Sequence, residues 1–306
     1  MRLLTIQEAF GRVYERQRRV DGLEVHASGH CAHVGRLSPG CKKCFVPDDF
    51  SANLYTGPRC NTSCEYCLGY TRGEELADEV KRNQIRTLFL QAVQTDFTDL
   101  IPSVSFTSGG GEPLLFMEII DEYMTAVREI APIVPKKIWC YLYTNGLLAN
   151  PNTVERLREM GLDEMRFHIG ASGFSDEVYR NIGIAVKELD TVTVETPAWP
   201  PHREQLFEML PRIQDLGVKH LNIGQIEVTR DNYDRIGRAL PDAEVYQHYD
   251  LVLDDGGLVY DLIEEILERG YSFSVLDCNC FVKSIQRAPF KRVMHAAVED
   301  LCIEPT

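Results

Sequence analysis

The chain has 306 residues, of which 44% are apolar and 25% are charged, a composition typical of a soluble globular protein with a sizeable core. Its formal net charge of −14 argues against bulk binding of nucleic acid, because an acidic surface repels phosphate backbones. No apolar stretch is long enough to cross a bilayer, and the charged segment from Met1 to Val20 lacks the apolar region of a signal peptide. We therefore expect a cytoplasmic protein with no membrane contact.

The first fifty residues are predicted to form a helix followed by a loop. Thr5 and Glu8 have the spacing of a capping box, and apolar residues follow at helical intervals, which predicts a helix from Thr5 to about Val20. Residues 21–50 are rich in Gly, His, Cys and Pro and show no periodicity, which indicates a structured loop.

Beyond residue 50, predicted strands and helices alternate. Strands are expected at 52–55, 104–107, 138–143, 165–169, 192–195, 220–226 and 272–276, and helices at 74–93, 114–130, 152–161, 206–217 and 258–267. Such alternation implies parallel strands joined by crossover helices, with functional residues in the loops that follow the strands.

The predicted fold class is therefore α/β, with a partial (β/α)6 TIM-like barrel. We expect this barrel core over residues 51–230. An N-terminal helix and a Cys/His-rich segment would precede it over residues 1–50, and a C-terminal extension over residues 231–306 would close the barrel.

Six of the ten cysteines lie between positions 31 and 67, and three of them form a tight motif. Cys60, Cys64 and Cys67 have the spacing C-x3-C-x2-C, and three close thiolates can hold three irons of a cubane while the fourth iron stays open. An alternative is a structural zinc site made of two C-x2-C pairs, Cys41 with Cys44 and Cys64 with Cys67. The zinc alternative leaves Cys60 without a role.

A glycine-rich turn follows the second predicted strand. Gly110 and Gly111 would let a ligand approach the backbone closely, and Glu112 would offer a carboxylate to a ligand ammonium group. The alternative is an ordinary strand-to-helix turn with an acidic first helical turn.

Together these residues resemble two motifs of the radical S-adenosylmethionine (SAM) superfamily. The Cys60–Cys67 loop, with Tyr66 before its last cysteine, is similar to the cluster motif, and Gly110-Gly111-Glu112-Pro113 is similar to the Gly-Gly-Glu motif. The resemblance covers roughly residues 50–230 and implies a [4Fe-4S] cluster with SAM on its unique iron. It also implies oxidoreductase chemistry, in which a low-potential donor such as a flavodoxin or ferredoxin drives cleavage of SAM to a 5′-deoxyadenosyl radical that abstracts hydrogen from a substrate.

The resemblance also implies further SAM contacts. Tyr66 would flank the adenine, and polar residues that follow later strands would reach the cofactor: Thr144, Asn145, His168, Ser172 and Glu195. The alternatives are core packing for Tyr66 and His168 and a simple Asn-Gly turn for Asn145.

The remaining cysteines suggest a second metal site, with zinc or a second cluster. Its predicted ligands are Cys41 and Cys44, supplemented from Cys31, His33, Cys278 and Cys280. The alternative is thiols that behave as small hydrophobic groups. The segments around Cys41 and Cys278 resemble uncharacterised radical SAM proteins related to pyruvate formate-lyase activating enzymes, which implies a peptide or protein substrate. A small-molecule substrate stays open, as does a different class of function: a zinc-stabilised binding or scaffold protein that uses Cys41, Cys44, Cys64 and Cys67.

Overall fold

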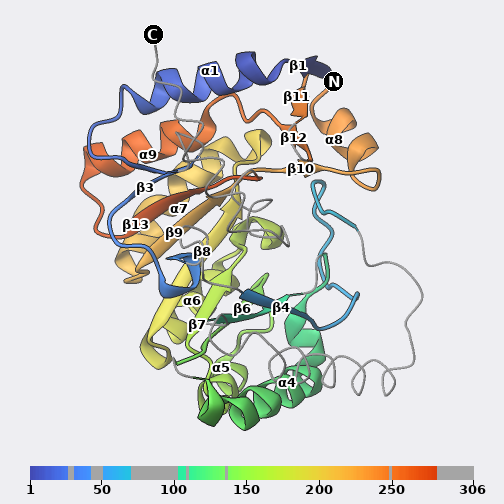
Figure 1. The fold of residues 1–306 in the computed structure, drawn as a ribbon, viewed down its shortest axis with the longest axis vertical. Helices are drawn as coiled ribbons and strands as arrows, with labels where there is room; N and C mark the ends of the chain where they lie inside the picture. Colours follow the sequence, from blue (N-terminus) through green and yellow to red (C-terminus); the bar gives the residue numbers. More distant parts are fainter. Residues whose placement is uncertain are drawn as a thin grey trace. The chain divides into compact units, whose positions relative to one another are not determined.

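The computed structural model describes residues 1–26, 31–42, 51–69, 103–107, 110–134, 137–247 and 250–280, so the predicted helix at 74–93 lies outside the described residues (Figure 1). The chain divides into two compact units. Unit 1 comprises residues 1–47, 64–68 and 193–306, and unit 2 comprises residues 48–63 and 69–192. Over the described ranges, no helix combines the length and the apolar character needed to cross a membrane.

Unit 2 is built on four parallel strands. They pair in the order β4 (Ser51–Tyr55), β5 (Ser103–Thr107), β6 (Trp139–Thr144) and β7 (Glu164–Phe167). The helices that follow them are α4 (Met117–Ile130), α5 (Pro151–Met160) and α6 (Asp176–Glu188). Because the strands are parallel, the loops after Thr107, Thr144 and Phe167 leave the sheet at the same edge.

The core of unit 2 explains why these segments form strands. Phe106, Leu142 and Met165 are fully buried on successive strands, and the Phe106 ring stacks on Tyr123 of helix α4 with centroids 6.2 Å apart. Helix α5 begins where the Asn150 side chain accepts the Thr153 N–H at 3.1 Å, and it ends at Gly161, whose φ of 95° is left-handed.

Unit 1 holds a second set of parallel strands with an antiparallel hairpin at one side. Strand β8 (Thr191–Pro197) pairs in parallel with β9 (His220–Gly224), and β9 pairs in parallel with β13 (Ser274–Cys278). Strands β3 (Cys31–Val34) and β2 (Glu24–His26) continue this sheet in antiparallel order. Its helices are α2 (Pro39–Lys42), α7 (Arg203–Asp215) and α9 (Leu258–Arg269).

A smaller sheet completes unit 1. Its order is β1 (Arg2–Leu4), β11 (Glu244–Gln247), β12 (Leu251–Leu253) and β10 (Glu227–Val228), with β1 and β11 parallel and the other pairs antiparallel. Helix α8 (Tyr233–Ala239) lies in the chain between β10 and β11.

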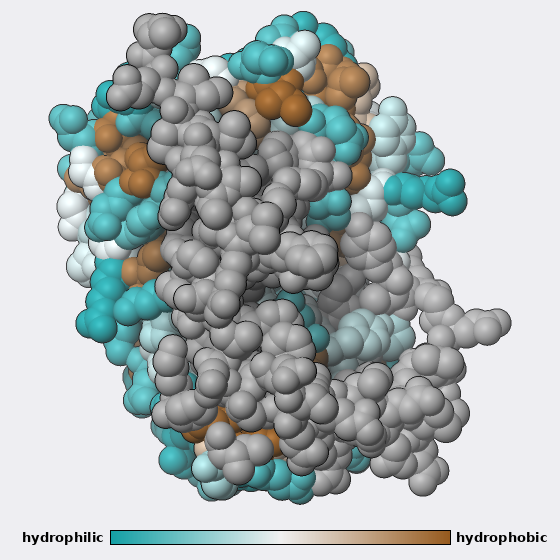
Figure 2. Space-filling model, viewed as in Figure 1, coloured by the Kyte–Doolittle hydropathy of each residue, from teal (hydrophilic) through white to brown (hydrophobic). Residues whose placement is uncertain are grey.

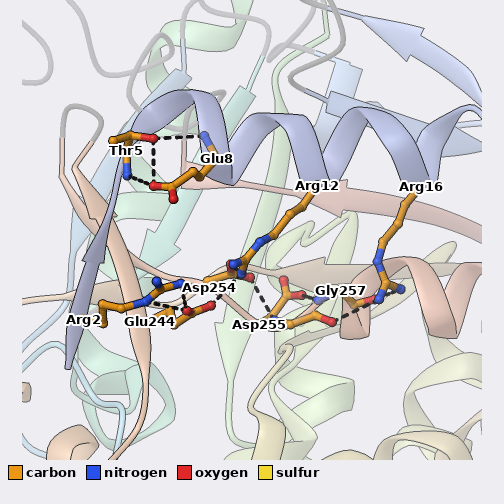
Figure 3. A network of polar contacts seen from close by, with 10 residues as sticks. Arg2, Thr5, Glu8, Arg12, Arg16, Glu244, Asp254, Asp255 and Gly257 are labelled. Atoms are coloured by element: carbon orange, nitrogen blue, oxygen red, sulfur yellow. Dashed lines mark hydrogen bonds and ion pairs between the residues drawn. The ribbon is translucent and has the colours of Figure 1, made fainter.

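Helix α1 (Ile6–Gln17) begins with the predicted capping box, and its arginine side chains bind the segment before α9 (Figure 3). Thr5 accepts the Glu8 N–H at 3.2 Å, while the Glu8 carboxylate accepts the Thr5 N–H at 2.7 Å. Arg12 binds Glu244 and Asp254 at 2.6 and 2.7 Å. Because these pairs are partly solvated, each is worth at most about 1 kcal/mol.

The alternation of strands and helices predicted from sequence is confirmed in both units, with three differences. Residues 21–50 hold the short strands β2 and β3, which the aperiodic composition concealed. Helices α2, α6 and α8 and the small sheet were not predicted. The strand predicted at 220–226 ends at Gly224, because the chain continues into the other sheet as β10.

Figure 2 shows small hydrophobic patches separated by hydrophilic ones over the described surface of this face.

Candidate functional site

In unit 2, the carboxylate of Glu112 joins the ends of two neighbouring strands. It accepts hydrogen bonds from the Thr144 hydroxyl at 2.7 Å, the Asn145 N–H at 2.7 Å and the Leu114 N–H at 3.0 Å. The side chain is only 1% exposed. Burial raises the pKa of Glu112, while the three donors act in the opposite direction. The predicted SAM ligand is therefore already the centre of a buried network.

Asn145 extends this network to the cysteine loop. Its Nδ2 donates to Asn61 Oδ1 at 2.6 Å and lies 3.9 Å from Cys60 Sγ. Its Oδ1 accepts the Leu147 N–H at 3.1 Å, and Gly146 has a left-handed φ of 83°. Asn145 thus forms the Asn-Gly turn and also contacts the cysteine motif, while its SAM contact stays a prediction.

The glycine turn is fixed to the same loop through the backbone. The Glu112 N–H donates to the Arg59 carbonyl at 2.7 Å, next to Cys60 in the chain. Gly110 adopts a φ of 126°, which L side chains rarely occupy, and both Gly110 and Gly111 are half-buried. Unit 2 therefore brings together Cys60, Gly110, Gly111, Glu112, Thr144 and Asn145.

His168 and Ser172 lie beyond the end of β7 in the same unit. The His168 N–H donates to the Thr144 carbonyl at 2.7 Å, which places its backbone beside the network, and its side chain is half-buried. The Ser172 hydroxyl donates to the Ile169 carbonyl at 2.8 Å and so stabilises a short 3-10 turn. His168 joins the network through its main chain, whereas Ser172 makes a local bond.

The other two cysteines of the motif belong to unit 1, where polar side chains hold their loop. Asn232, fully buried, donates to the Tyr66 carbonyl at 3.1 Å and to the Glu227 carbonyl at 2.9 Å, and it accepts the Thr229 N–H at 2.7 Å. Arg235 Nη2 donates to the Cys67 carbonyl at 2.7 Å. Cys64 and Cys67 are each half-buried, so their sulfur atoms are neither sealed in the core nor fully solvated.

Tyr66 packs within unit 1 as a core residue. Its ring centroid lies 5.4 Å from that of Trp199 and 6.2 Å from that of His202. The side chain is 7% exposed and belongs to an apolar cluster with Ile226 and Val228. Burial, with a further contribution from Cys64, raises the pKa of Tyr66. Core packing is therefore the observed role of Tyr66, and the adenine contact stays a prediction.

The residues predicted for a second metal site are spread over unit 1. Asn222 Nδ2 donates to Cys41 Sγ at 3.2 Å and to Glu195 Oε2 at 2.8 Å, so Cys41 and Glu195 share one partner. The backbones of Cys278 and Cys280 both bond Gln225. Cys44 and the side chain of Cys31 lie outside the described residues.

The described residues contain one set of three side chains with metal-ligand spacing, and it includes none of these cysteines. The set consists of Glu24, His26 and His33. Of the predicted second-site ligands, only His33 takes part in it.

Unit 1 also contains a cavity of about 290 Å³ between helix α1 and the segment before α9. Asp254, Asp255 and Asp277 line it together with Arg12 and Arg16. Burial, reinforced by the charges of Asp254 and Asp277, raises the pKa of Asp255 to about 7. Figure 3 shows Asp255 beside Gly257, whose N–H it accepts at 2.6 Å.

Sequence reasoning missed four polar residues that hold the predicted site residues: Asn61, Asn222, Asn232 and Arg235. Asn61 lies inside the cysteine motif and was open to identification from its position. The other three carry no local signal, because their partners are far away in the sequence.

Comparison with known proteins finds similarity to one family over part of the chain. A model of the Radical SAM superfamily matches residues 54–190. The "Putative glycyl-radical enzyme activating enzyme" of Methanocaldococcus jannaschii is 25% identical over 210 residues, which are 66% of this chain and 53% of that protein. The chain thus spans about half the length of the curated relative it matches.

Solved structures show the same fold. Streptococcus suis SuiB bound to S-adenosylmethionine has a TM-score of 0.54 at 14% identity, over 81% of this chain and 54% of SuiB. A polyhistidine-tagged anSMEcpe with bound AdoMet has a TM-score of 0.51 at 15% identity, over 74% of this chain and 61% of that one. With the parallel strands of both units, these likenesses confirm the predicted α/β, partial-barrel fold class. The resemblance to the radical SAM superfamily is confirmed as well.

Proposed function

We propose that this chain, which carries a radical SAM enzyme domain over residues 54–190, binds a [4Fe-4S] cluster through Cys60, Cys64 and Cys67 and uses it to cleave SAM reductively. The observation that carries the proposal is the hydrogen-bonded set in unit 2 that links Cys60, Glu112 and Asn145. Three motifs distant in sequence, the cysteine loop, the glycine turn and the polar end of β6, supply its members.

The chemistry of the donor set fits the cluster. The three cysteines lie within eight consecutive positions, and each keeps some exposure. Thiolates are the usual ligands of such clusters, and hydrogen bonds to their sulfur atoms tune the reduction potential. When bound, the cluster would pass one electron from a low-potential donor to SAM and so release methionine and a 5′-deoxyadenosyl radical, which takes a hydrogen atom from the substrate.

Some residues of the chain would then hold the glycine turn in place, and others would contact SAM. Glu112 and Thr144 are buried and bond each other, so they hold the turn in place and leave little of their own surface for a ligand. We assign the SAM contacts to the half-buried Gly110 and Gly111 and to one remaining acceptor position on the Glu112 carboxylate, which has about four such positions. Asn145 would orient the loop beside the cluster.

We also propose SAM contacts for the four remaining predicted residues, His168, Ser172, Glu195 and Tyr66. His168 lies next to Thr144 through its backbone, and Ser172 follows in the same turn. Glu195 is half-buried and held by Asn222, and Tyr66 packs against Trp199. Each would contact SAM only through surface that these partners leave accessible.

The proposed substrate is a peptide or a protein. The M. jannaschii relative is named for activation of a glycyl-radical enzyme, which is a protein, and one SuiB structure is described as bound to the precursor peptide SuiA. A small molecule is the second candidate. The proposed electron donor is a flavodoxin or a ferredoxin, and we expect the reaction to take place in the cytoplasm. The division into residues 1–50, 51–230 and 231–306 and a second metal site that includes Cys41 and Cys44 also stay predictions.

The decisive experiment compares two cysteine variants of the full chain after anaerobic cluster reconstitution. We expect about four irons per wild-type chain and release of 5′-deoxyadenosine from SAM in the presence of a reductant. Cys60→Ala should lower that release about 100-fold or more, because one cluster ligand is lost. Cys140→Ala is the matched control, since burial raises the pKa of Cys140 to about 12 and keeps it an inert thiol of strand β6.

Two outcomes would overturn the proposal. One is a wild-type protein that stays colourless, binds zinc in place of iron and leaves SAM intact, as expected of a zinc-stabilised scaffold protein. The other is a Cys60→Ala variant that keeps full iron content and full SAM cleavage.

A further inference from the structure

We propose that Glu24, His26 and His33 bind one divalent transition-metal ion, zinc in the first place, on the β2–β3 hairpin of unit 1. The site uses none of the residues assigned to the cluster or to SAM. Its existence does not depend on the proposed radical chemistry.

The distances between the ligand atoms suit a zinc ion. One ligand atom from each residue lies within 4.8 Å of the other two. The two histidine Nε2 atoms are 2.8 Å apart, and His33 Nε2 lies 3.8 Å from Glu24 Oε2. Zinc bonds of about 2.0–2.1 Å in a tetrahedron set ligand atoms about 3.4 Å apart. The two observed distances bracket that value, so small side-chain shifts would complete the site.

Strand pairing holds the three residues together. Glu24 and His33 are direct partners across the antiparallel pair, and His26 follows Glu24 by two positions, so the three side chains share one face. On its other side, β3 pairs with β13, where His33 lies opposite Leu276. The metal ligands therefore stand on strands, which hold their geometry better than a loop would.

The orientation of His33 is also that of a metal ligand. Its Nδ1 lies 3.0 Å from the Gly35 carbonyl, an acceptor that keeps the proton on Nδ1. The lone pair of Nε2 then points toward His26 and Glu24. Histidine ligands of metals commonly donate their other ring N–H to a carbonyl in this way. Because the His33 side chain is only 6% exposed, its ring is held in this orientation.

Access from solvent also fits a metal site. The side chain of Glu24 is 66% exposed, so an ion can reach the site from solvent, and a water molecule can take the fourth position. Without a metal, a His26–His33 hydrogen bond accounts for the 2.8 Å distance, and Glu24 pairs with His33 at 3.8 Å only when that histidine is protonated. A metal ion would engage all three side chains with both rings neutral.

The test is a metal titration of the full chain that carries its reconstituted cluster. Co²⁺ should bind in one equivalent with ligand-field absorption and without thiolate-to-cobalt charge transfer, and Zn²⁺ should displace it. We expect His26→Ala to weaken Zn²⁺ binding about 100-fold or more and Glu24→Gln to weaken it about 10-fold. These two residues are half-buried and exposed, so the variants should fold as the wild type does.

Matched controls come from the same unit. His220→Ala removes a histidine that contacts Ser274 at 2.7 Å, and Glu15→Gln removes an exposed carboxylate. Both should bind Zn²⁺ as the wild type does. Iron content and SAM cleavage should be unchanged in His26→Ala, so a failure of the cluster proposal would be visible separately.

Two results would overturn the inference. If the wild type binds Zn²⁺ no more tightly than His26→Ala, the histidines form only a hydrogen-bonded pair. If Co²⁺ shows thiolate charge transfer that survives His26→Ala, the ion is held by cysteines and not by this hairpin.

Discussion

The amide nitrogen of the Asn145 side chain lies 3.9 Å from the sulfur of Cys60, although 85 positions separate the two residues in the sequence. The contact exists because the Asn145 backbone is held by the buried Glu112 carboxylate at 2.7 Å. A residue at a strand end is thereby positioned to act on a thiolate.

Asn145→Asp should move the reduction potential of the cluster to more negative values. The substitution keeps the acceptor for the Leu147 N–H but replaces a donor near the Cys60 sulfur with a negative charge, and both changes disfavour the added electron. A redox titration followed by electron paramagnetic resonance measures the midpoint. Asn150→Asp is the control, because aspartate caps helix α5 as well as asparagine does. Equal midpoints for Asn145→Asp and wild type would show that Asn145 does not act on the cluster.

Glu112→Gln should destabilise unit 2 and slow SAM cleavage. The glutamine amide presents N–H groups to at least one of the donors from Thr144, Asn145 and Leu114, which leaves a buried donor without an acceptor. The expected cost in the free energy of unfolding is about 1–3 kcal/mol. Chemical denaturation measures it, with the exposed Glu118→Gln on α4 as control. A variant as stable and as active as wild type would remove Glu112 from both roles.

Asp255→Asn should change how stability depends on pH. The pKa of Asp255 is about 7 in the fold against an ordinary value of 3.8, so between these values the folded chain keeps a proton that the unfolded chain has lost. The contribution of Asp255 to the free energy of unfolding therefore falls as pH rises between these two values, by about 1.4 kcal/mol per pH unit. Asp255→Asn should remove this slope, so the variant should gain stability relative to wild type between about pH 5 and pH 7. Asp242→Asn, at an exposed position, is the control. If the free energies of unfolding of wild type and Asp255→Asn depend on pH in parallel, the raised pKa of Asp255 is contradicted.

Asn232→Ala should loosen the loop that carries Cys64 and Cys67. The change removes bonds to the Tyr66 and Glu227 carbonyls and to the Thr229 N–H, in a place with no access to water. We expect a loss of about 2–4 kcal/mol in stability and less iron retained after reconstitution. Iron analysis and thermal unfolding measure both, with the exposed Asn152→Ala as control. Full iron retention in Asn232→Ala would mean that the loop keeps its shape without this residue.

Much of the fold was predictable because strong local signals agree with the tertiary structure. The Thr5–Glu8 capping box begins α1, and Gly161 ends α5, as their sequence patterns indicate. Helix α6 escaped prediction because Asn181 and Gly183 interrupt its apolar spacing. Strands β2, β3 and β10 to β12 are too short for periodicity to show. Their positions depend on pairings that the sequence does not reveal, including those of β3 with β13 and of β10 with β12.

The candidate site was predictable as a set of motifs but not as a set of contacts. Cysteine spacing and the glycine turn predict Cys60 and Glu112 as site residues, and the structure links both to Asn145 by hydrogen bonds. The sequence around Glu112 does not indicate that its carboxylate accepts a hydrogen bond from Thr144 at the end of β6. The sequence around Tyr66 likewise does not indicate that its ring packs against Trp199. Such facts depend on which loops meet in space, and for this chain only the structure supplies them.

The bond from Arg235 to the Cys67 carbonyl spans 168 positions of sequence, and this has a consequence for biosynthesis. A ribosome that has translated all three motif cysteines has not yet made Asn232 or Arg235. The hydrogen bonds that hold the loop around Tyr66 and Cys67 can therefore form only after residues 232–235 have been synthesised. For the proposed cluster, we accordingly expect insertion to be more efficient into the folded full chain than into a chain that ends before residue 232.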